Sequence, residues 1–409
     1  MLVARLLRGV QLPRIRSKLL VMSRPVTSTI KILIVVGLLA FLIGLHVINF
    51  KSAEGMDFEH YYVGAKMVAA GQGALLHSSD AQFEWQGRIL GGASTPFNYP
   101  APMALLYWPT TLLDLNGGYL LWTILSTLMF AASVLLLNRT FGFANDSWFL
   151  VLLCAGYLPV QATLASGQCD AFLLLVYAVA LVCLKNGKAE ESGLVLSLAL
   201  LKFHLVLPFA LVMLMRKQWR FLLGFGTGAI VLLGIWTWIS GPGLFTAYPR
   251  LLMSMKVVPR GGFEPSLMAN FRGVFFVLTR HEAPTWVLGA VAFGLLIFVA
   301  RRWKKVETGF AASMTMMLLT SYHGYVYDLI LLLIPLMVMS KVAKNSKGLL
   351  FIVFGFLAVP VVPYLLVRER SVWPLAIPIA VLCWILMSDQ VGEGKQATED
   401  ADQHRLTAV

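Results

Sequence analysis

Residues 57–71 read Asp-Phe-Glu-His-Tyr-Tyr-Val-Gly-Ala-Lys-Met-Val-Ala-Ala-Gly and directly follow the first long apolar run of the chain. Their apolar and aromatic side chains recur at helical spacing, which predicts an amphipathic helix lying at a membrane surface. Asp57 would begin that helix, at the boundary between water and lipid. Asp is also a preferred N-cap, and Glu59 suits the dipole of a first turn, so a purely capping role for Asp57 stays open.

The composition around this stretch is that of a membrane protein. The chain has 409 residues, of which 58% are hydrophobic and 13% charged, and this balance predicts an all-α polytopic membrane protein. The net charge of +13 comes from short basic clusters between apolar runs. Such clusters set the orientation of membrane helices, so we expect no nucleic-acid partner.

The cysteines and the N-terminus add little chemistry of their own. The cysteines lie in or beside apolar runs without a Cys-x-x-Cys pair or Cys/His ligand spacing, so we expect neither a disulfide framework nor a zinc site. The basic N-terminus shows no convincing cleavage site, which favours a first span that is retained as an anchor. The four cysteines are Cys154, Cys169, Cys183 and Cys383.

The basic clusters predict a topology of about ten full spans, with both termini in the cytoplasm. Residues 1–388 would form one transmembrane domain with external loops at 51–100 and 240–285, and residues 389–409 a disordered cytoplasmic tail. We expect the short run at 102–113 to be interfacial or re-entrant. The predicted spans are 30–50, 118–137, 147–163, 171–184, 221–239, 286–300, one on each side of 321–328, 349–367 and 373–387.

Residues 189–215 predict a different element, because basic clusters stand at both ends of this apolar stretch. Two full crossings need about 40 residues, which favours a re-entrant hairpin of two half-helices. Its turn would hold Lys202, Phe203 and His204. Broken helices at membrane depth are tolerated where they line a polar cavity, so this hairpin is a functional candidate.

Four polar residues that are far apart in sequence fall at the external ends of the predicted spans, namely Asp57, Gln168, Asp170 and His323. A carboxylate and a histidine beside a basic external loop suit proton abstraction from a hydroxyl next to a bound phosphate. The chain has no Gly-x-Ser-x-Gly turn and no phosphate-cradling Gly-rich loop, which argues against nucleophilic hydrolysis.

Simpler structural roles are open for each of these residues. Gln168 and Asp170 would also suit the cap of the following helix. A lysine at a re-entrant turn is costly unless it is paired, although Lys202 could snorkel to the interface. His204 would suit packing, and His323 an interfacial place among aromatic residues. The same belt of aromatic residues would accommodate Tyr61, Tyr62, Tyr99 and Trp108.

Short sequence pieces in a fixed order resemble glycosyltransferase family 87, a group similar to polyprenyl-phosphate-mannose-dependent mannosyltransferases with the GT-C membrane fold. The resemblance runs over roughly residues 57–335. The pieces are Asp57-Phe58 with Tyr61-Tyr62 and Gly64, Tyr99-Pro100 with Pro102, Gly167-Gln168, Gly193 followed by Lys202 and Pro208, and Ser321 with His323.

The resemblance implies that Asp57 is the catalytic base, that His323 lies near the donor, and that Lys202 is the basic residue of the broken helix. The chain departs from the family pattern at three positions, which leaves the sugar and the acceptor open. Asp170 stands where the family often has Asn, Phe203 where it has Pro, and Gly324 where a second histidine is usual.

The predicted function is therefore an inverting transfer of mannose or another hexose from a polyprenyl-phosphate donor to a lipid-linked or surface glycan. We expect it on the extracytoplasmic face of a bacterial cytoplasmic membrane, without a metal or other cofactor. The alternatives are a transporter or flippase for a lipid-linked anion and a structural subunit. Predicted substrate-binding residues are Tyr61, Tyr62, Tyr99, Gln168, Asp170, Lys202, Arg250 and Arg260.

Overall fold

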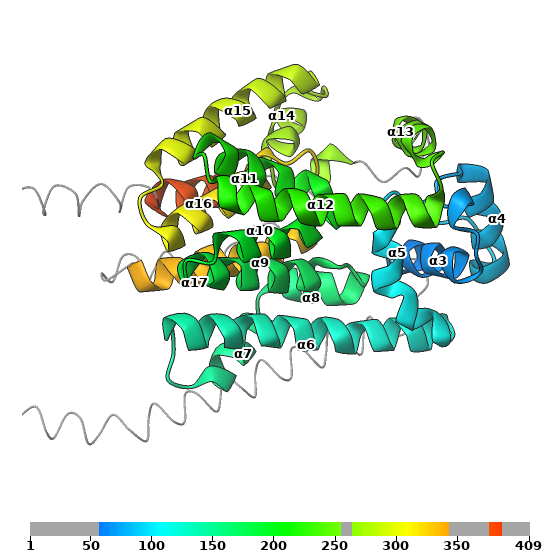
Figure 1. The fold of residues 1–409 in the computed structure, drawn as a ribbon, viewed down its shortest axis with the longest axis horizontal. Coiled ribbons are helices and arrows are strands. Elements are labelled where there is room, and N and C mark those ends of the chain that lie inside the picture. Colours follow the sequence, from blue (N-terminus) through cyan, green and yellow to red (C-terminus); the bar gives the residue numbers. More distant parts are fainter. Residues whose placement is uncertain (1–56, 255–263, 343–375, 387–409) are drawn as a thin grey trace, which may run out of the picture.

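The computed structural model describes residues 57–254, 264–342 and 376–386, and these residues form helices joined by turns, with no strand among them (Figure 1). The predicted spans at 30–50 and 349–367 lie outside the described residues. So do Arg260, the basic N-terminal segment and the tail at 389–409.

Among the described residues, four helical segments are long and apolar enough to cross a membrane by length and composition, or five if one bent pair forms a single span. They are α6 (Leu115–Phe141), the segment Ala189–Met215, α12 (Trp219–Ser240) and α15 (Thr285–Arg302). The outer faces of α12 and α15 are largely uncovered, and Trp238 on α12 is 81% exposed. The chain is a multi-pass membrane protein, while the predicted count of ten full spans is not confirmed.

The predicted span at 147–163 is interrupted, because the chain bends there by 70° between two short helices. These are α7 (Ser147–Ala155) and α8 (Leu158–Ser166). Pro159 lies in the first turn of α8, where a missing N–H is harmless, and Gly156 ends α7. Gln161 Nε2 donates a 2.7 Å hydrogen bond to the carbonyl of Ala155 and so satisfies an acceptor that the break sets free.

The segment Ala189–Met215 reverses direction in the middle. It consists of α10 (Ala189–Ser197), η3 (Leu198–Lys202) and α11 (Phe203–Met215). A straight helix would place Met215 about 33 Å from Gly193. Phe221 lies only six residues after Met215, a reach of about 20 Å, yet a Cβ on Gly193 would collide with the carbonyl of Phe221. The two halves therefore form the predicted hairpin, with the turn at Lys202.

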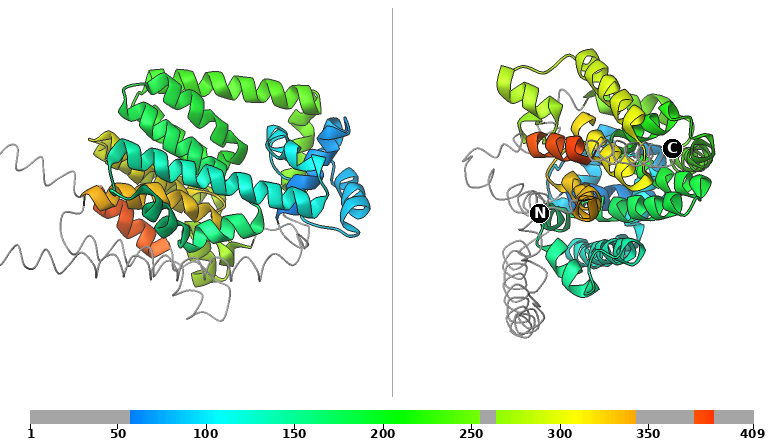
Figure 2. Two further views of the ribbon diagram at one scale, coloured as in Figure 1. Left: turned by 90° about the horizontal axis from the view of Figure 1, so that it is seen from below. Right: turned by 90° about the vertical axis from the view of Figure 1, so that its left-hand side faces the viewer.

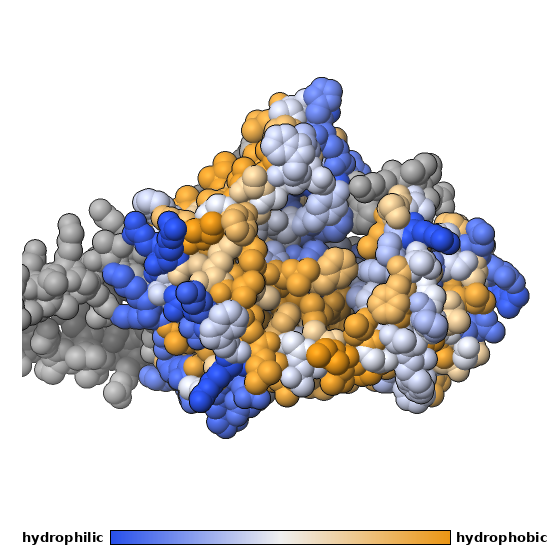
Figure 3. All heavy atoms as spheres, turned by 45° about the horizontal axis from the view of Figure 1, so that its top comes forward, coloured by the Kyte–Doolittle hydropathy of each residue, from blue (hydrophilic) through white to orange (hydrophobic). Residues whose placement is uncertain are grey.

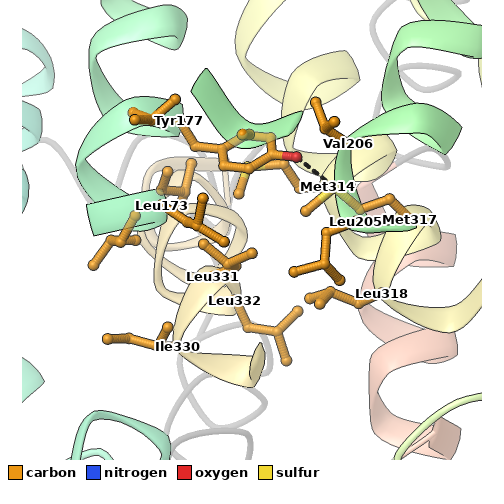
Figure 4. Packing of buried hydrophobic residues seen from close by; sticks show 14 of the residues in the cluster. Leu173, Tyr177, Leu205, Val206, Met314, Met317, Leu318, Ile330, Leu331 and Leu332 are labelled. Carbon is orange, nitrogen blue, oxygen red and sulfur yellow. Dashed lines mark hydrogen bonds between the residues drawn. The ribbon is translucent and has the colours of Figure 1, made fainter. Parts of the chain in front are cut away.

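The centre of the bundle is made of shorter, almost completely buried helices. These are α9 (Asp170–Lys185), α16 (Val306–Thr320), η5 (Tyr327–Leu332) and α17 (Leu333–Val342), with residues 376–386 packed beside α16. Figure 4 shows this core, in which the hydroxyl of Tyr177 donates to Met317 Sδ at 3.1 Å. The core holds the start of α9 and the start of η5 at fixed positions.

A group of short helices caps the end of the bundle where α6 begins (Figures 1 and 2). The predicted surface helix is among them as α3, but its side chains are buried on nearly every face, including Phe58, Tyr61 and Tyr62. That prediction is wrong because neighbouring helices cover the face that lipid was expected to cover. The group comprises α3 (Phe58–Ala69), η1 (Gly73–Leu75), α4 (Ser79–Leu90), α5 (Pro102–Tyr107) and η2 (Trp108–Leu112).

Three further elements belong to the region 240–285, namely α13 (Leu244–Ser254), η4 (Pro265–Leu267) and α14 (Phe271–Thr279). In Figure 3 the surface is hollowed between the α14–α15 side and the capping helices. Hydrophobic side chains cover the middle of that face and hydrophilic ones lie toward its ends. This banding is the one expected of a protein that sits in a bilayer.

Basic residues gather at the end of the bundle opposite the capping helices. Lys185 Nζ lies 2.9 Å from the carboxylate of Glu307 and over the ring of Phe141. Arg216 Nη1 donates to the carbonyl of Trp303 at 2.8 Å. The ends of α6, α9, α11 and α15 thus meet in one cationic region.

Candidate active site

Asp57 stands immediately before α3, but its side chain does not cap that helix. Its Oδ2 instead accepts a 2.7 Å hydrogen bond from Nε2 of Gln168, which lies 111 residues further along the chain. The side chain is half-buried, and it forms no ion pair with any described residue. The capping role is therefore wrong for Asp57, whose carboxylate bonds to a neutral amide instead.

Gln168 joins Asp57 to the aromatic core. Its Oε1 accepts a 2.7 Å hydrogen bond from the hydroxyl of Tyr61, while its Nε2 donates to Asp57. Gly167 before it has φ +68°, and a Cβ there would lie 2.6 Å from Cβ of Phe58. Glycine thus lets the end of α8 approach α3 closely enough for the amide to reach the acid. The side chain of Gln168 does not cap α9.

Aromatic side chains form the wall behind this contact. The ring of Tyr61 stacks on Tyr107 with centroids 4.3 Å apart, and Tyr107 stacks on Trp122 at 3.9 Å. The ring centroid of Tyr99 lies 4.9 Å from that of Tyr61. The hydroxyl of Tyr62 donates a 2.7 Å hydrogen bond to the carbonyl of Leu113.

The aromatic-belt interpretation is wrong for Tyr61 and Tyr62, because both are at least 98% buried in protein. It stays a prediction for Trp108, which is 46% exposed. A belt residue must reach the lipid headgroups, and the capping helices shield both tyrosines from them.

Two residues after Gln168, the chain enters a fully buried ion cluster. Lys202 Nζ lies 2.8 Å from Asp170 Oδ2 and 3.0 Å from Asp328 Oδ1, and it stands 4.7 Å from the ring centroid of Tyr327. The other oxygen of Asp328 accepts from the backbone N–H of Tyr325 at 2.8 Å. The cluster ties the starts of α9 and η5 to the turn of the α10–α11 hairpin.

These contacts settle two of the open structural roles. Lys202 is paired in the interior instead of snorkelling, and the side chain of Asp170 binds the ammonium and does not cap α9. The sequence reasoning left Asp328 out of the site. A signal for it was present, because a buried lysine needs an acidic partner and Asp328 ends the polar turn at 321–328.

His323 lies on that same turn, with its ring centroid 5.5 Å from that of His204 on α11. Burial lowers the pKa of His323 well below its usual range, and the neighbouring His204 and Arg272 lower it further. The imidazole is therefore neutral at physiological pH. In this state one ring nitrogen donates a hydrogen bond and the other accepts one.

Arg272 is the buried arginine beside this histidine. Its Nη2 lies 2.7 Å and 2.9 Å from the two carboxylate oxygens of Glu282, and its guanidinium stacks 4.1 Å from the ring of Tyr322. Arg250, which the sequence favoured, is exposed on α13 and forms no ion pair with described residues. Sequence reasoning missed Arg272 because nothing in its local pattern distinguishes it from the other basic residues of the loop.

Tyr325 follows His323 by two residues and lies within electrostatic range of Asp57. Burial raises the pKa of the Tyr325 hydroxyl, and the carboxylates of Asp328 and Asp57 raise it further, whereas its backbone contact and Arg272 oppose them. Both acids therefore act on a tyrosine two residues from His323. The described residues hold no group of three or more His, Cys, Asp or Glu placed to bind a metal.

One end of this multi-pass helical bundle therefore holds a half-buried acid, a neutral histidine and a buried arginine. The sequence profile of glycosyltransferase family 87 matches residues 97–321, more than half of the chain. The chain belongs to this family. The matched range contains Gln168, Asp170 and Lys202, while His323 lies two residues after its end and Asp57 lies 40 residues before its start.

The chain is also similar to an α-(1→3)-arabinofuranosyltransferase of Corynebacterium glutamicum, with 31% identity over 230 residues. The match covers 53% of this chain and 54% of the relative, so the chain spans about half the length of the curated relative it matches. No solved structure matches the chain.

Proposed function

We propose that the protein transfers a sugar, with inversion, from a polyprenyl-phosphate donor to a hydroxyl of a lipid-linked or surface glycan, using Asp57 as the general base and the GT-C type of fold. The observation that carries the proposal is the environment of the Asp57 carboxylate. This carboxylate is half-buried, has a neutral amide as its hydrogen-bond partner and forms no ion pair with described residues.

The proposed reaction is a single displacement. The acceptor oxygen bonds to the anomeric carbon as the bond between that carbon and the phosphate oxygen breaks, and the phosphate keeps the electron pair. The acceptor proton passes to Asp57. Gln168 uses only Oδ2, which leaves Oδ1 for the acceptor hydroxyl.

The leaving phosphate gains charge during this step and needs hydrogen-bond donors or cations. His323 is suited to donate from its neutral ring, with Arg272 close behind it. Lys202 contributes less than the sequence alone suggests, because two carboxylates already share its charge. Arg250 and Arg260 remain predictions for the donor, on a loop that would first meet the anionic lipid.

The charge distribution supports an extracytoplasmic site in a bacterial cytoplasmic membrane. The cationic region around Lys185 and Arg216 lies at the opposite end of the bundle from Asp57. Membrane proteins keep such clusters in the cytoplasm. Asp57 would then face outward, toward polyprenyl-linked sugars and glycans on the outer surface.

The donor sugar has two candidates. The sequence favours mannose or another hexose, and the name of the curated relative favours arabinofuranose. The test is to reconstitute the purified protein in vesicles with polyprenyl-phosphate mannose, glucose or arabinofuranose and with short mannoside or arabinofuranoside acceptors. Release of free polyprenyl phosphate together with a glycosylated acceptor is the expected result. Movement of the lipid between leaflets without any product would support the transporter instead.

A further inference from the structure

His60 lies one turn after Asp57 on α3 and has an unusual environment for a histidine. Its side chain is 4% exposed, and neither ring nitrogen has a hydrogen-bond partner among the described residues. Its ring centroid is 4.2 Å from that of Tyr61 and 5.8 Å from that of Tyr99, with the latter ring nearly parallel at 12°. The imidazole therefore packs against aromatic rings without a hydrogen bond to the described residues.

A second buried histidine in the same capping region has one of its two ring nitrogens hydrogen-bonded. His77 is also 4% exposed, but its Nε2 accepts a 3.0 Å hydrogen bond from Nε1 of Trp236. Leaving a buried polar group unsatisfied costs about 1–3 kcal/mol. A phenylalanine would fill the position of His60 without that cost, so packing alone does not explain the histidine.

The charges nearest to His60 belong to the site already described. Burial lowers its pKa to about 4, with the carboxylate of Asp57 opposing this change and Lys202 adding to it. The ring is therefore neutral near pH 7 and presents one donor and one acceptor. A hydroxyl group, which both donates and accepts, matches this pair. A phosphate, which only accepts, would use the donor and leave the other nitrogen unsatisfied.

The parallel ring of Tyr99 supplies the second half of a sugar-binding surface. An aromatic face beside polar groups of fixed direction is suited to the apolar face and the hydroxyl edge of a sugar ring. Because His60 and Asp57 are three residues apart on a helix, their side chains lie on neighbouring parts of one face. A sugar that offers its reactive hydroxyl to Asp57 would bring its other hydroxyls toward His60.

We infer that His60 binds the acceptor glycan, donating a hydrogen bond to one hydroxyl of the acceptor sugar and accepting one from a hydroxyl, next to the hydroxyl that loses its proton to Asp57. This inference rests on the proposed function and adds to it the residue that positions and selects the acceptor.

The test is steady-state kinetics of transfer to the acceptor that the wild-type protein uses, with His60→Phe and His60→Gln and with His77→Phe as the matched control. His60→Phe keeps an aromatic ring and removes both polar atoms. We expect its KM for the acceptor to rise about 10–100-fold, the cost of one or two hydrogen bonds. Its KM for the donor should stay within about twofold, and its Tm should be unchanged or higher. His60→Gln restores a donor and an acceptor and should recover part of the loss.

His77→Phe loses the bond to Trp236 and should lower Tm without changing either KM. An acceptor KM for His60→Phe equal to that of the wild type, or equal increases for donor and acceptor, would overturn the inference. If His60→Phe does not fold, the acceptor KM of His60→Gln decides in the same way. If the wild type turns over no donor in the panel, the proposed function fails first, so the two failures are distinguishable.

Discussion

Asp57 and Asp170 occupy contrasting environments at the same end of the bundle. Asp57 is half-buried and bonds to a neutral amide, Gln168. Asp170, two residues after that amide, is fully buried and bonds to the ammonium of Lys202, which Asp328 shares. The carboxylate of Asp57 has no ion-pair partner among the described residues, whereas the carboxylate of Asp170 forms an ion pair with Lys202.

The difference separates chemistry from architecture. An ion pair in the interior is costly to break, so the cluster around Lys202 fixes the positions of three helix ends. A carboxylate with a neutral partner can accept a proton without disrupting the fold. The proposed base should therefore be replaceable without unfolding, whereas the members of the cluster should not.

The largest expected effect is the loss of the lysine at the centre of the cluster. Lys202→Met leaves two buried carboxylates without a cation, and we expect it to destabilise the protein by about 3–5 kcal/mol. Thermal unfolding in detergent measures this. Lys185→Met is the control, because its pair with Glu307 is partly exposed and worth about 0–1 kcal/mol. Equal losses in the two variants would remove the distinction between the cluster and a surface pair.

The next effect is a dependence of stability on acid. The pKa of His60 and that of His77 are both lowered to about 4. Below pH 6.5 these histidines bind protons in the unfolded chain but stay neutral in the folded protein. The free energy of unfolding should therefore fall as the pH drops from about 6.5 to about 4. Each histidine should contribute about 1–3 kcal/mol.

Melting temperatures across this range would show the dependence, and His77→Phe should flatten part of it. A profile that does not change in that variant would mean that His77 takes up its proton in the folded state.

A smaller effect follows from removing the amide that holds Asp57. Gln168→Leu takes away the only hydrogen bond that Asp57 makes with a side chain of the described residues. We expect transfer to slow by about 10–100-fold because the carboxylate is less well oriented, with a loss of stability of about 1–2 kcal/mol. Paired measurements of rate and Tm would test this. An unchanged rate would show that Asp57 needs no orientation by Gln168.

The smallest expected effect comes from Tyr61, whose hydroxyl bonds to Gln168 and reaches Asp57 only through that amide. Tyr61→Phe keeps the stack on Tyr107 and loses only the hydroxyl that Gln168 accepts from. A loss of about 0.5–1.5 kcal/mol and a less than tenfold change in rate are expected. A rate loss as large as that of Gln168→Leu would mean that Tyr61 itself contacts the substrate.

Much of this arrangement could be read from the sequence. The basic clusters at both ends of 189–215 predicted the hairpin, because a chain of that length cannot cross twice. Polar residues at the ends of apolar runs likewise predicted that Asp57, Gln168 and Asp170 meet, since spans of similar length bring their ends to one level. These are constraints that local composition carries.

Other features depend on which helices become neighbours, which composition does not encode. The burial of Tyr61 and Tyr62 follows from helices that cover α3, so the periodicity of α3 alone indicated a lipid-facing surface. The bend at Gly156 could not be predicted from hydropathy, because residues 147–166 are as apolar as a straight span. The burial of Arg272 follows from the packing of α14 on the turn at 321–328.

The most direct test of the central claim is the transfer rate of Asp57→Asn, measured beside its Tm. Asparagine keeps the shape of the side chain and cannot take the acceptor proton. We expect the transfer rate of Asp57→Asn to fall by at least about 10²–10⁴-fold. Its Tm should stay within about 2 °C of the wild type because no buried ion pair is lost. Transfer by Asp57→Asn at the wild-type rate would show that Asp57 is not the general base.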